Sequence, residues 1–417
     1  MRKILMATTA LVGVALAGSA QAAATSPISL DVGGYTDFLG GLYHESTDLP
    51  AGVKQDGHDF ETEFKLNFDA LGKASNGIEY GANVSLWNGP DVSNAWTGGG
   101  TGVTVDSAYV WLSGAFGKAL FGDEHGASDL FVYAPTVGEG QIDGAYMDFV
   151  SPFTLARFQP SGIDNTEHST KVTYYTPKVG NENNKVQLGL SYIPNMYDSG
   201  DNVIKYETPT GLGNSIANSP YQDVVKGAAQ YTGNFNPVNV TLSAQILEGL
   251  ASSDVMSATT VGSGLSAAAI PGSGIFAKKA ADFVAYGFGG QVGYQGFTVG
   301  GSYMSDGRYD TIHAQNREQN NFTLGGKYEF DKVAIAANWI TASGYDDMLV
   351  GGSTATGFAN TDYVKDFNAY GLGATYTWFP GLTTGLDAIF FTQDRQDPTK
   401  ADENAGHVLL VSQKLTF

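Results

Sequence analysis

The segment HDFETEFKLNFDA, His58 to Ala70, alternates between two kinds of side chain. One set is Phe60, Thr62, Phe64, Leu66, Phe68 and Ala70, and the other is Asp59, Glu61, Glu63, Lys65, Asn67 and Asp69. Strict alternation predicts a β-strand with one apolar and one polar face. The fold depends on which of these two faces meets water.

Similar alternation recurs along the chain, whereas helical periodicity is hard to find, so the sequence predicts an all-β protein. The predicted strands are 28–44, 58–70, 76–88, 103–113, 118–125, 168–176, 185–194, 223–232, 238–249, 282–294, 297–305, 319–330, 333–343, 365–378, 382–394 and 405–417. Their number is even, and most are close to the ~10 residues that a tilted strand needs to cross a membrane.

The connections between these strands alternate in length. The short ones are 71–75, 114–117, 177–184, 233–237, 295–296, 331–332 and 379–381, and the long ones are 45–57, 89–102, 126–167, 195–222, 250–281, 306–318, 344–364 and 395–404. Short turns at one end and long loops at the other are typical of an outer-membrane barrel. The two-residue turns at 295–296 and 331–332 also keep one continuous apolar face, because Tyr294 and Phe297, like Phe330 and Val333, become direct partners.

A closed sheet of sixteen strands encloses a lumen too wide for side chains to fill. Water then fills the lumen, the polar face lines it, and the apolar face meets lipid. We therefore predict a 16-stranded antiparallel transmembrane β-barrel with short periplasmic turns and long extracellular loops. A β-sandwich with the aromatic residues in its core is the alternative.

The N-terminus has the features of an export signal. Arg2 and Lys3 precede the uncharged run 4–17, and Ala20-Gln21-Ala22 fits a small-residue cleavage site. The predicted organisation is a signal peptide at 1–22 and a barrel at 23–417. After cleavage 20 basic residues face 42 acidic ones, a formal charge of −22, which makes nucleic acid an improbable partner. The chain has no cysteine, so it has neither disulfides nor thiolate metal sites.

The C-terminal sequence VLLVSQKLTF, Val408 to Phe417, alternates up to a terminal phenylalanine. It resembles the C-terminal assembly signal of Gram-negative outer-membrane proteins, with Leu415 and Phe417 in the apolar set and Gln413 as an interruption. The segment AYVWLSGAFGKALFGDEHGA, 108–127, resembles the hairpin that precedes the constriction loop of general porins. The chain is thus similar to the general, trimeric, 16-stranded porins of Gram-negative bacteria, of alphaproteobacterial type. It departs from them at Asp123-Glu124, where many relatives have a base, and it lacks their acidic loop-tip sequence.

This resemblance implies that the third long loop, 126–167, folds inward and narrows the barrel. The predicted acidic residues of the constriction are Asp129, Glu139, Asp143 and Asp148, and the predicted bases of the pore wall are Lys65, Lys171, Lys226, Lys327 and Arg157. Asp59, Glu61 and Glu63 are predicted acids of the wall. Opposed charges across a narrow, water-filled gap discriminate between ions, and the acidic excess predicts a preference for cations.

The predicted function is passive diffusion of small hydrophilic solutes and ions through a homotrimer, in contact with outer-membrane lipid and lipopolysaccharide. No enzymatic activity and no cofactor are predicted. The six histidines show no metal-ligand spacing, and Asp346-Asp347 is a candidate for loosely bound calcium or simply a solvated acidic pair. A solute-specific channel, a barrel enzyme and an adhesin that uses the long loops are the alternatives.

Overall fold

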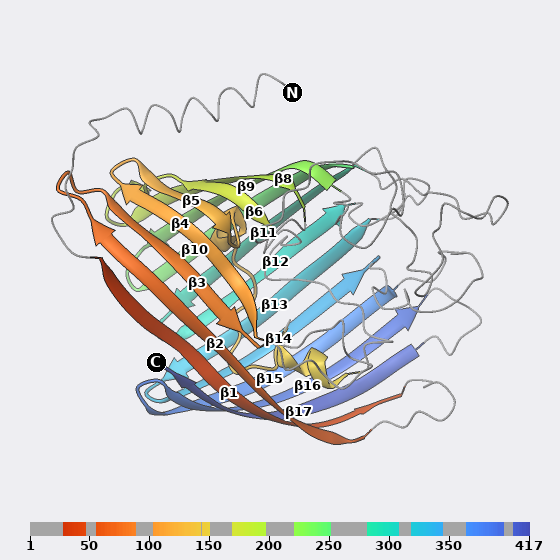
Figure 1. Ribbon diagram of the computed structural model, residues 1–417. Helices are drawn as coiled ribbons and strands as arrows, with labels where there is room; N and C mark the ends of the chain where they lie inside the picture. The colour runs from red at the N-terminus through yellow and green to blue at the C-terminus, as the bar shows by residue number, and fades with distance from the viewer. Residues whose placement is uncertain are drawn as a thin grey trace, which may run out of the picture.

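The computed structural model describes residues 28–46, 56–88, 103–142, 144–150, 169–196, 221–251, 282–307, 318–344, 364–395 and 403–417. The strands are β1 (Ser29–Glu45), β2 (His58–Lys73), β3 (Glu79–Trp87), β4 (Thr104–Gly114), β5 (Gly117–Asp123), β6 (Thr170–Tyr175), β7 (Val179–Gly180), β8 (Asn184–Asn195), β9 (Tyr221–Asn234), β10 (Val238–Ala251), β11 (Phe283–Tyr294), β12 (Phe297–Gly307), β13 (Gln319–Phe330), β14 (Val333–Ser343), β15 (Val364–Phe379), β16 (Leu382–Arg395) and β17 (Glu403–Thr416). Two short 3-10 helices, η2 (Ala127–Leu130) and η3 (Ala145–Phe149), lie inside the ring of strands (Figure 1). No helix among the described residues is long and apolar enough to span a membrane.

The strands form one closed antiparallel sheet. Apart from β6 and β7, each strand pairs with its neighbours in the sequence, and β1 also pairs with β17, from Tyr35 opposite Thr416 to Glu45 opposite Gly406. Both β6 and β7 pair with β8, so together they take one place in the ring. The barrel therefore has sixteen positions, and the prediction of a 16-stranded antiparallel barrel is confirmed.

The predicted strand limits agree closely with the structure. The strands β13 and β14 have the predicted limits, and most other limits differ by one to three residues. The predicted short connection 177–184 contains the two-residue strand β7. Both predicted two-residue turns are present, with Tyr294 opposite Phe297 and Phe330 opposite Val333.

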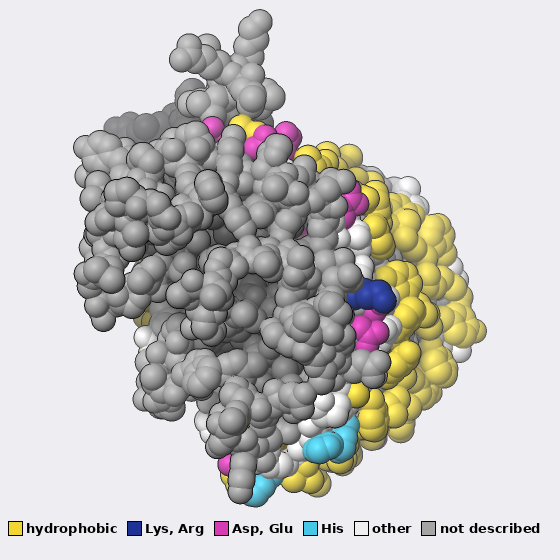
Figure 2. All heavy atoms as spheres, turned by 90° about the vertical axis from the view of Figure 1, so that its right-hand side faces the viewer, with side chains coloured by type: hydrophobic (Ala, Val, Ile, Leu, Met, Phe, Trp, Pro, Cys, Tyr) yellow, Lys and Arg dark blue, Asp and Glu magenta, His cyan; other side chains and the backbone are white. Residues whose placement is uncertain are grey.

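The apolar face of the strands points away from the barrel axis. Phe60 of β2 is 70% exposed, and alternate residues of β11 such as Phe288 and Val292 are exposed as well. Figure 2 shows hydrophobic side chains gathered over the visible outer wall. Aromatic residues beside the short turns are also exposed, namely Phe235, Tyr294, Phe297, Phe330 and Trp378. An outer surface of this kind suits lipid, with aromatic residues at the headgroup level.

The inner wall is not polar throughout, which differs from the prediction. On β14 to β17 and β1 it carries a buried apolar cluster that includes Leu39, Ile340, Phe367, Ala369, Ile389, Phe391, Val408 and Leu410. A second cluster on β8 to β12 includes Ile193, Val224, Leu247, Phe283, Ala285 and Met304. Apolar surface facing a water-filled lumen is unfavourable, and in both clusters residues of the third loop cover it.

Candidate functional site

The third loop begins at a root that is fastened to β8 and β9. The amide of Ala127 donates a hydrogen bond to Ser191 Oγ (2.8 Å), and the Lys226 ammonium donates one to Ser128 Oγ (3.1 Å). The amide of Gly126 donates to Glu124 Oε2 (2.6 Å). Glu124 directly follows the last residue of β5, and its carboxylate stabilises the turn into the loop.

From this root the loop follows the inner wall across successive strands. The amide of Val132 donates to Ser243 Oγ of β10 (2.9 Å), and the amide of Ala134 donates to Thr323 Oγ1 of β13 (3.2 Å). Between them, Gln291 of β11 donates its side-chain amide to the Tyr133 carbonyl (2.7 Å). These bonds connect residues far apart in sequence, so the described part of the loop lies within the barrel and not over its mouth.

The middle of the loop is held by one carboxylate of β16. Asp387 Oδ2 accepts hydrogen bonds from the amides of Glu139 (3.1 Å) and Gly140 (3.3 Å), and its Oδ1 accepts one from Gln141 Nε2 (3.1 Å). The Gln141 side chain in turn accepts a hydrogen bond from Asn338 Nδ2 of β14. Charge-assisted bonds of this kind are the stronger ones in proteins, so Asp387 is the principal polar anchor of this segment.

Apolar contacts hold the segment that follows. Ile142, Tyr146, Phe149 and Val150 are buried against the inner apolar cluster of β14 to β17 and β1. Phe149 lies against Gly41 of β1 so closely that a Cβ atom at Gly41 would overlap its ring. The buried loop residues Leu130, Phe131, Tyr146 and Phe149 thus pack on the inner wall.

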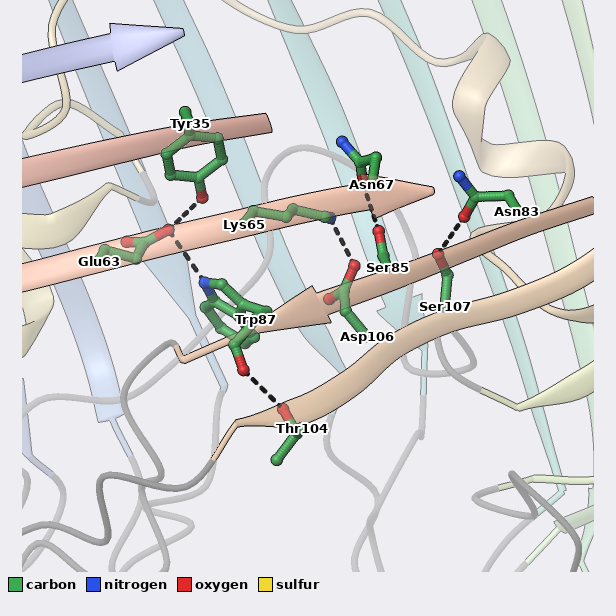
Figure 3. Close-up of polar contacts among 10 residues, drawn as sticks. All are labelled: Tyr35, Glu63, Lys65, Asn67, Asn83, Ser85, Trp87, Thr104, Asp106 and Ser107. Atoms are coloured by element: carbon green, nitrogen blue, oxygen red, sulfur yellow. Dashed lines mark hydrogen bonds and ion pairs between the residues drawn. The ribbon is translucent and has the colours of Figure 1, made fainter. Parts of the chain in front are cut away.

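Polar side chains cover the inner wall of β1 to β4 (Figure 3). Glu63 accepts hydrogen bonds from the Tyr35 hydroxyl and from Trp87 Nε1 (3.0 Å), and Lys65 forms a 2.5 Å ion pair with Asp106. Further along the same strands are the hydrogen bonds Ser85–Asn67 and Ser107–Asn83. The odd-numbered residues of β2 therefore face inward, as the alternation of the segment predicts.

Acids of this wall lie near acids of the loop. Glu61 interacts electrostatically with Asp148 of the loop and with Glu63, Asp37 and Asp59 on the wall. Asp37 interacts with Glu139 of the loop. The side of the lumen between β1, β2 and the loop thus carries a group of neighbouring acidic residues.

The predicted constriction acids differ in their surroundings. Asp129 and Asp148 are exposed, and Asp129 Oδ2 accepts a 3.4 Å hydrogen bond from the Tyr175 hydroxyl. Glu139 is half-buried and forms a 3.0 Å ion pair with Lys414 of β17. Asp143 lies outside the described residues, as does the predicted base Arg157.

The predicted wall bases require a correction. Lys171 and Lys226 do point inward, but they are only 2% and 0% exposed. Lys171 donates to the Glu124 carbonyl and Lys226 to Ser128, so both lie at the loop root and do not face open water across from the loop. Lys65 is paired with Asp106, and Lys327 forms a 3.1 Å ion pair with Glu329.

Sequence reasoning missed three residues that matter for this site: Asp37, Asp387 and Lys414. Each is in phase with the inward residues of its strand, so the alternation could have identified all three. Lys414 lies between Gln413 and Leu415 of the C-terminal segment, in which a role was predicted only for the outward-facing residues. No group of three or more metal-ligating side chains is found among the described residues.

A closed sixteen-position barrel, apolar outside and narrowed by a loop fastened to its inner wall, is the architecture of a porin, a channel of the bacterial outer membrane. The family model described as Gram-negative porin matches residues 7–396, so the chain belongs to this family. It is therefore an outer-membrane protein and a porin channel.

Solved structures agree with this assignment at the level of the fold. An anion-selective porin from Comamonas acidovorans is 14% identical, with a TM-score of 0.55 over 94% of this chain and 100% of its own. A loop-deletion mutant of OmpT, an outer membrane protein of Vibrio cholerae, is 12% identical, with a TM-score of 0.53 over 93% and 99% of the two chains. Among curated proteins, none matches the sequence.

Proposed function

We propose that this porin is a cation-preferring diffusion channel for small hydrophilic solutes. The observation that carries the proposal is the acidic surface made by Asp37, Asp59, Glu61 and Glu63 of the wall with Asp148 of the loop. Carboxylates along a narrow, low-dielectric passage raise the local concentration of cations and repel anions.

The positions of the bases support the same preference. Lys65, Lys327 and Lys414 are each paired with a carboxylate, at Asp106, Glu329 and Glu139 respectively. Lys171 and Lys226 are buried at the loop root. Among the described residues, the bases predicted for the wall thus contribute little unbalanced positive charge to the passage.

Ion selectivity in planar bilayers tests this proposal. We expect reversal potentials in a KCl gradient to show preference for potassium over chloride. Replacing Glu61 by Gln or Asp148 by Asn should each reduce the permeability ratio by about threefold, because one unit charge about 5 Å away in a watery pore changes an ion's energy by somewhat under 1 kcal/mol.

A matched control removes a carboxylate away from the loop. Asp331→Asn neutralises a turn residue between β13 and β14, and asparagine tolerates its positive φ of 49°. This variant should leave the permeability ratio unchanged. A clear chloride preference of the unaltered channel would refute the proposal.

Export and assembly are part of the same proposal. We expect the signal peptide to be cleaved after Ala22, so that N-terminal sequencing of the membrane protein begins at Ala23. We also propose a homotrimer in contact with lipopolysaccharide, without a required cofactor and with at most loosely bound calcium. Cross-linking in detergent and conductance with and without a chelator test these points.

The alternatives give different outcomes in the same bilayer system. A plugged adhesin would show no conductance, and a solute-specific channel would show saturable block by its ligand. A barrel enzyme would turn over a substrate and lose that activity when two or three loop residues are replaced. The porin family and fold favour a channel.

A further inference from the structure

The ammonium group of Lys414 has two close partners on the inner wall. Its Nζ atom lies 3.0 Å from Glu139 Oε1 of the loop and 4.3 Å from the centroid of the Tyr35 ring. A carboxylate together with an aromatic face is a combination that binds organic cations. The Lys414 side chain is about a quarter exposed, so this position can be reached from the lumen.

The same position lies beside an unusual row of charges. In the register of β17, β1 and β2, Lys414 is directly opposite Asp37, and Asp37 is directly opposite Glu63. Like charges directly opposite each other on neighbouring strands are destabilising. Lys414 offsets this repulsion only partly, because its ammonium group is also the ion-pair partner of Glu139.

The Asp37 carboxylate lacks one hydrogen-bond partner. Asp37 is only 2% exposed, and its Oδ1 atom accepts no hydrogen bond from the described residues. A buried carboxylate oxygen without a donor is costly. It faces Lys414 across the strand pair and interacts electrostatically with Glu139 and Glu63, so a further donor at this point would be stabilising.

We propose that Asp37, Glu139 and the Tyr35 ring form a binding site for the alkylammonium group of a permeating solute, and that Lys414 is a tethered competitor for it. A primary ammonium group supplies three hydrogen-bond donors, enough for Glu139 and the free Asp37 oxygen. The lysine side chain ends in the same chemical group, and its contacts with Glu139 and the Tyr35 ring show that these two partners accept an ammonium group. This inference deepens the proposed cation preference and rests on it.

The described residues favour an organic cation over a metal ion. A metal site needs several oxygen ligands that converge at about 2.3–2.6 Å for calcium, and no group of three or more ligating side chains is present in the described part of the chain. An ammonium group needs only hydrogen-bond distances and gains from the aromatic ring.

Block of the potassium current by n-butylammonium chloride tests the proposal. This probe is the lysine side chain without its backbone, and 1-butanol is the uncharged control. In the unaltered channel we expect saturable block by n-butylammonium and none by 1-butanol. Lys414→Met should strengthen the block about tenfold, the factor expected when one competing ion pair and cation–π contact are removed.

Three further variants separate charge from folding. Lys414→Arg keeps the competing charge and should be blocked as the unaltered channel is. Asp37→Asn should weaken the block in both the unaltered and the Lys414→Met channels. Lys73→Met removes a lysine that is paired with Glu79 at 2.9 Å, at the β2–β3 turn, and should leave the block unchanged.

The reversal potential of the same channels in a KCl gradient separates the two proposals. Two results would overturn the binding site and leave the proposed function intact. The first is potassium preference without saturable block, and the second is equal block of the unaltered channel and Lys414→Met. Chloride preference overturns both proposals. Circular dichroism on heating checks that each variant is folded.

Discussion

Asp387 is the residue whose single carboxylate does most to position the constriction loop. It accepts hydrogen bonds from Glu139, Gly140 and Gln141, about 250 residues earlier in the chain. Glu139 also carries the ion pair with Lys414. The position of the loop acid that pairs with β17 therefore depends on Asp387, a buried residue of β16.

Replacing Asp387 by Ala should enlarge the passage and raise single-channel conductance. Each lost hydrogen bond to a charged group contributes about 1.5–3 kcal/mol, and the three are not additive because they share one carboxylate. The measurement is the distribution of single-channel conductances in planar bilayers.

Asp387→Asn is the matched variant, because its side-chain oxygen still accepts from the loop. It should change the conductance less than Asp387→Ala does. Equal conductance in the unaltered channel and Asp387→Ala would contradict the anchoring role.

At the scale of elements, the inward loop and the inner apolar wall depend on each other. The apolar wall of β14 to β17 and β1 would face water without the loop, and the segment with η3 would expose Tyr146 and Phe149 without the wall. Because burial of apolar surface drives both, the loop and the wall form one packed unit.

Phe149→Ala should loosen this unit. Removal of a buried phenylalanine side chain lowers the free energy of unfolding by about 3–5 kcal/mol in well-packed cores. We expect a loss at the lower end of this range, because Phe149 lies in a loop and not in a strand. We expect a lower thermal midpoint by circular dichroism and a broader distribution of conductances.

Gly41→Leu tests the same contact from the wall, since its side chain would overlap the Phe149 ring. Phe235→Ala is the control, because Phe235 is an exposed aromatic residue beside the β9–β10 turn. A thermal midpoint that falls as much for Phe235→Ala as for Phe149→Ala would argue against a specific role of the loop contact.

At the scale of the whole molecule, the barrel is closed where β1 pairs with β17. The amide of Gly34 donates to the Phe417 carbonyl (2.9 Å), and the amide of Phe417 donates to the Gly34 carbonyl (3.0 Å). The Phe417 and Leu415 side chains are 57% and 47% exposed on the outer wall. The terminal residue thus completes the seam with its backbone and presents its ring outward.

Deletion of Phe417 should reduce the yield of folded barrel. It removes both backbone bonds at the end of the seam and one aromatic residue of the outer surface, and an incomplete seam leaves a sheet edge unpaired. The fraction folded after dilution into detergent, measured by circular dichroism, checks this expectation.

Phe417→Trp keeps both backbone bonds and an aromatic side chain, so it should fold as the unaltered chain does. If the deletion variant gave the same yield of folded barrel as Phe417→Trp, Phe417 would not be needed for assembly.

Much of the barrel could be predicted because strand alternation is a local property. The phase of β2, the two hairpins at 295–296 and 331–332, and the limits of β13 and β14 all follow from neighbouring residues. The candidate site was predicted less well. Lys171 and Lys226 have the inward phase, but phase does not reveal that the loop root covers them.

The sequence by itself determined the strand number, the inward and outward faces, the long third loop and the acidic excess, since each depends on local pattern or on composition. Only the tertiary structure decided which charges meet: Lys414 with Glu139, Lys65 with Asp106, and Asp387 with the loop amides. Two of these pairs join a strand to the third loop, and the third joins β2 to β4 across β3. Their distances are set by closure of the barrel and by the path of the loop, which no local pattern encodes.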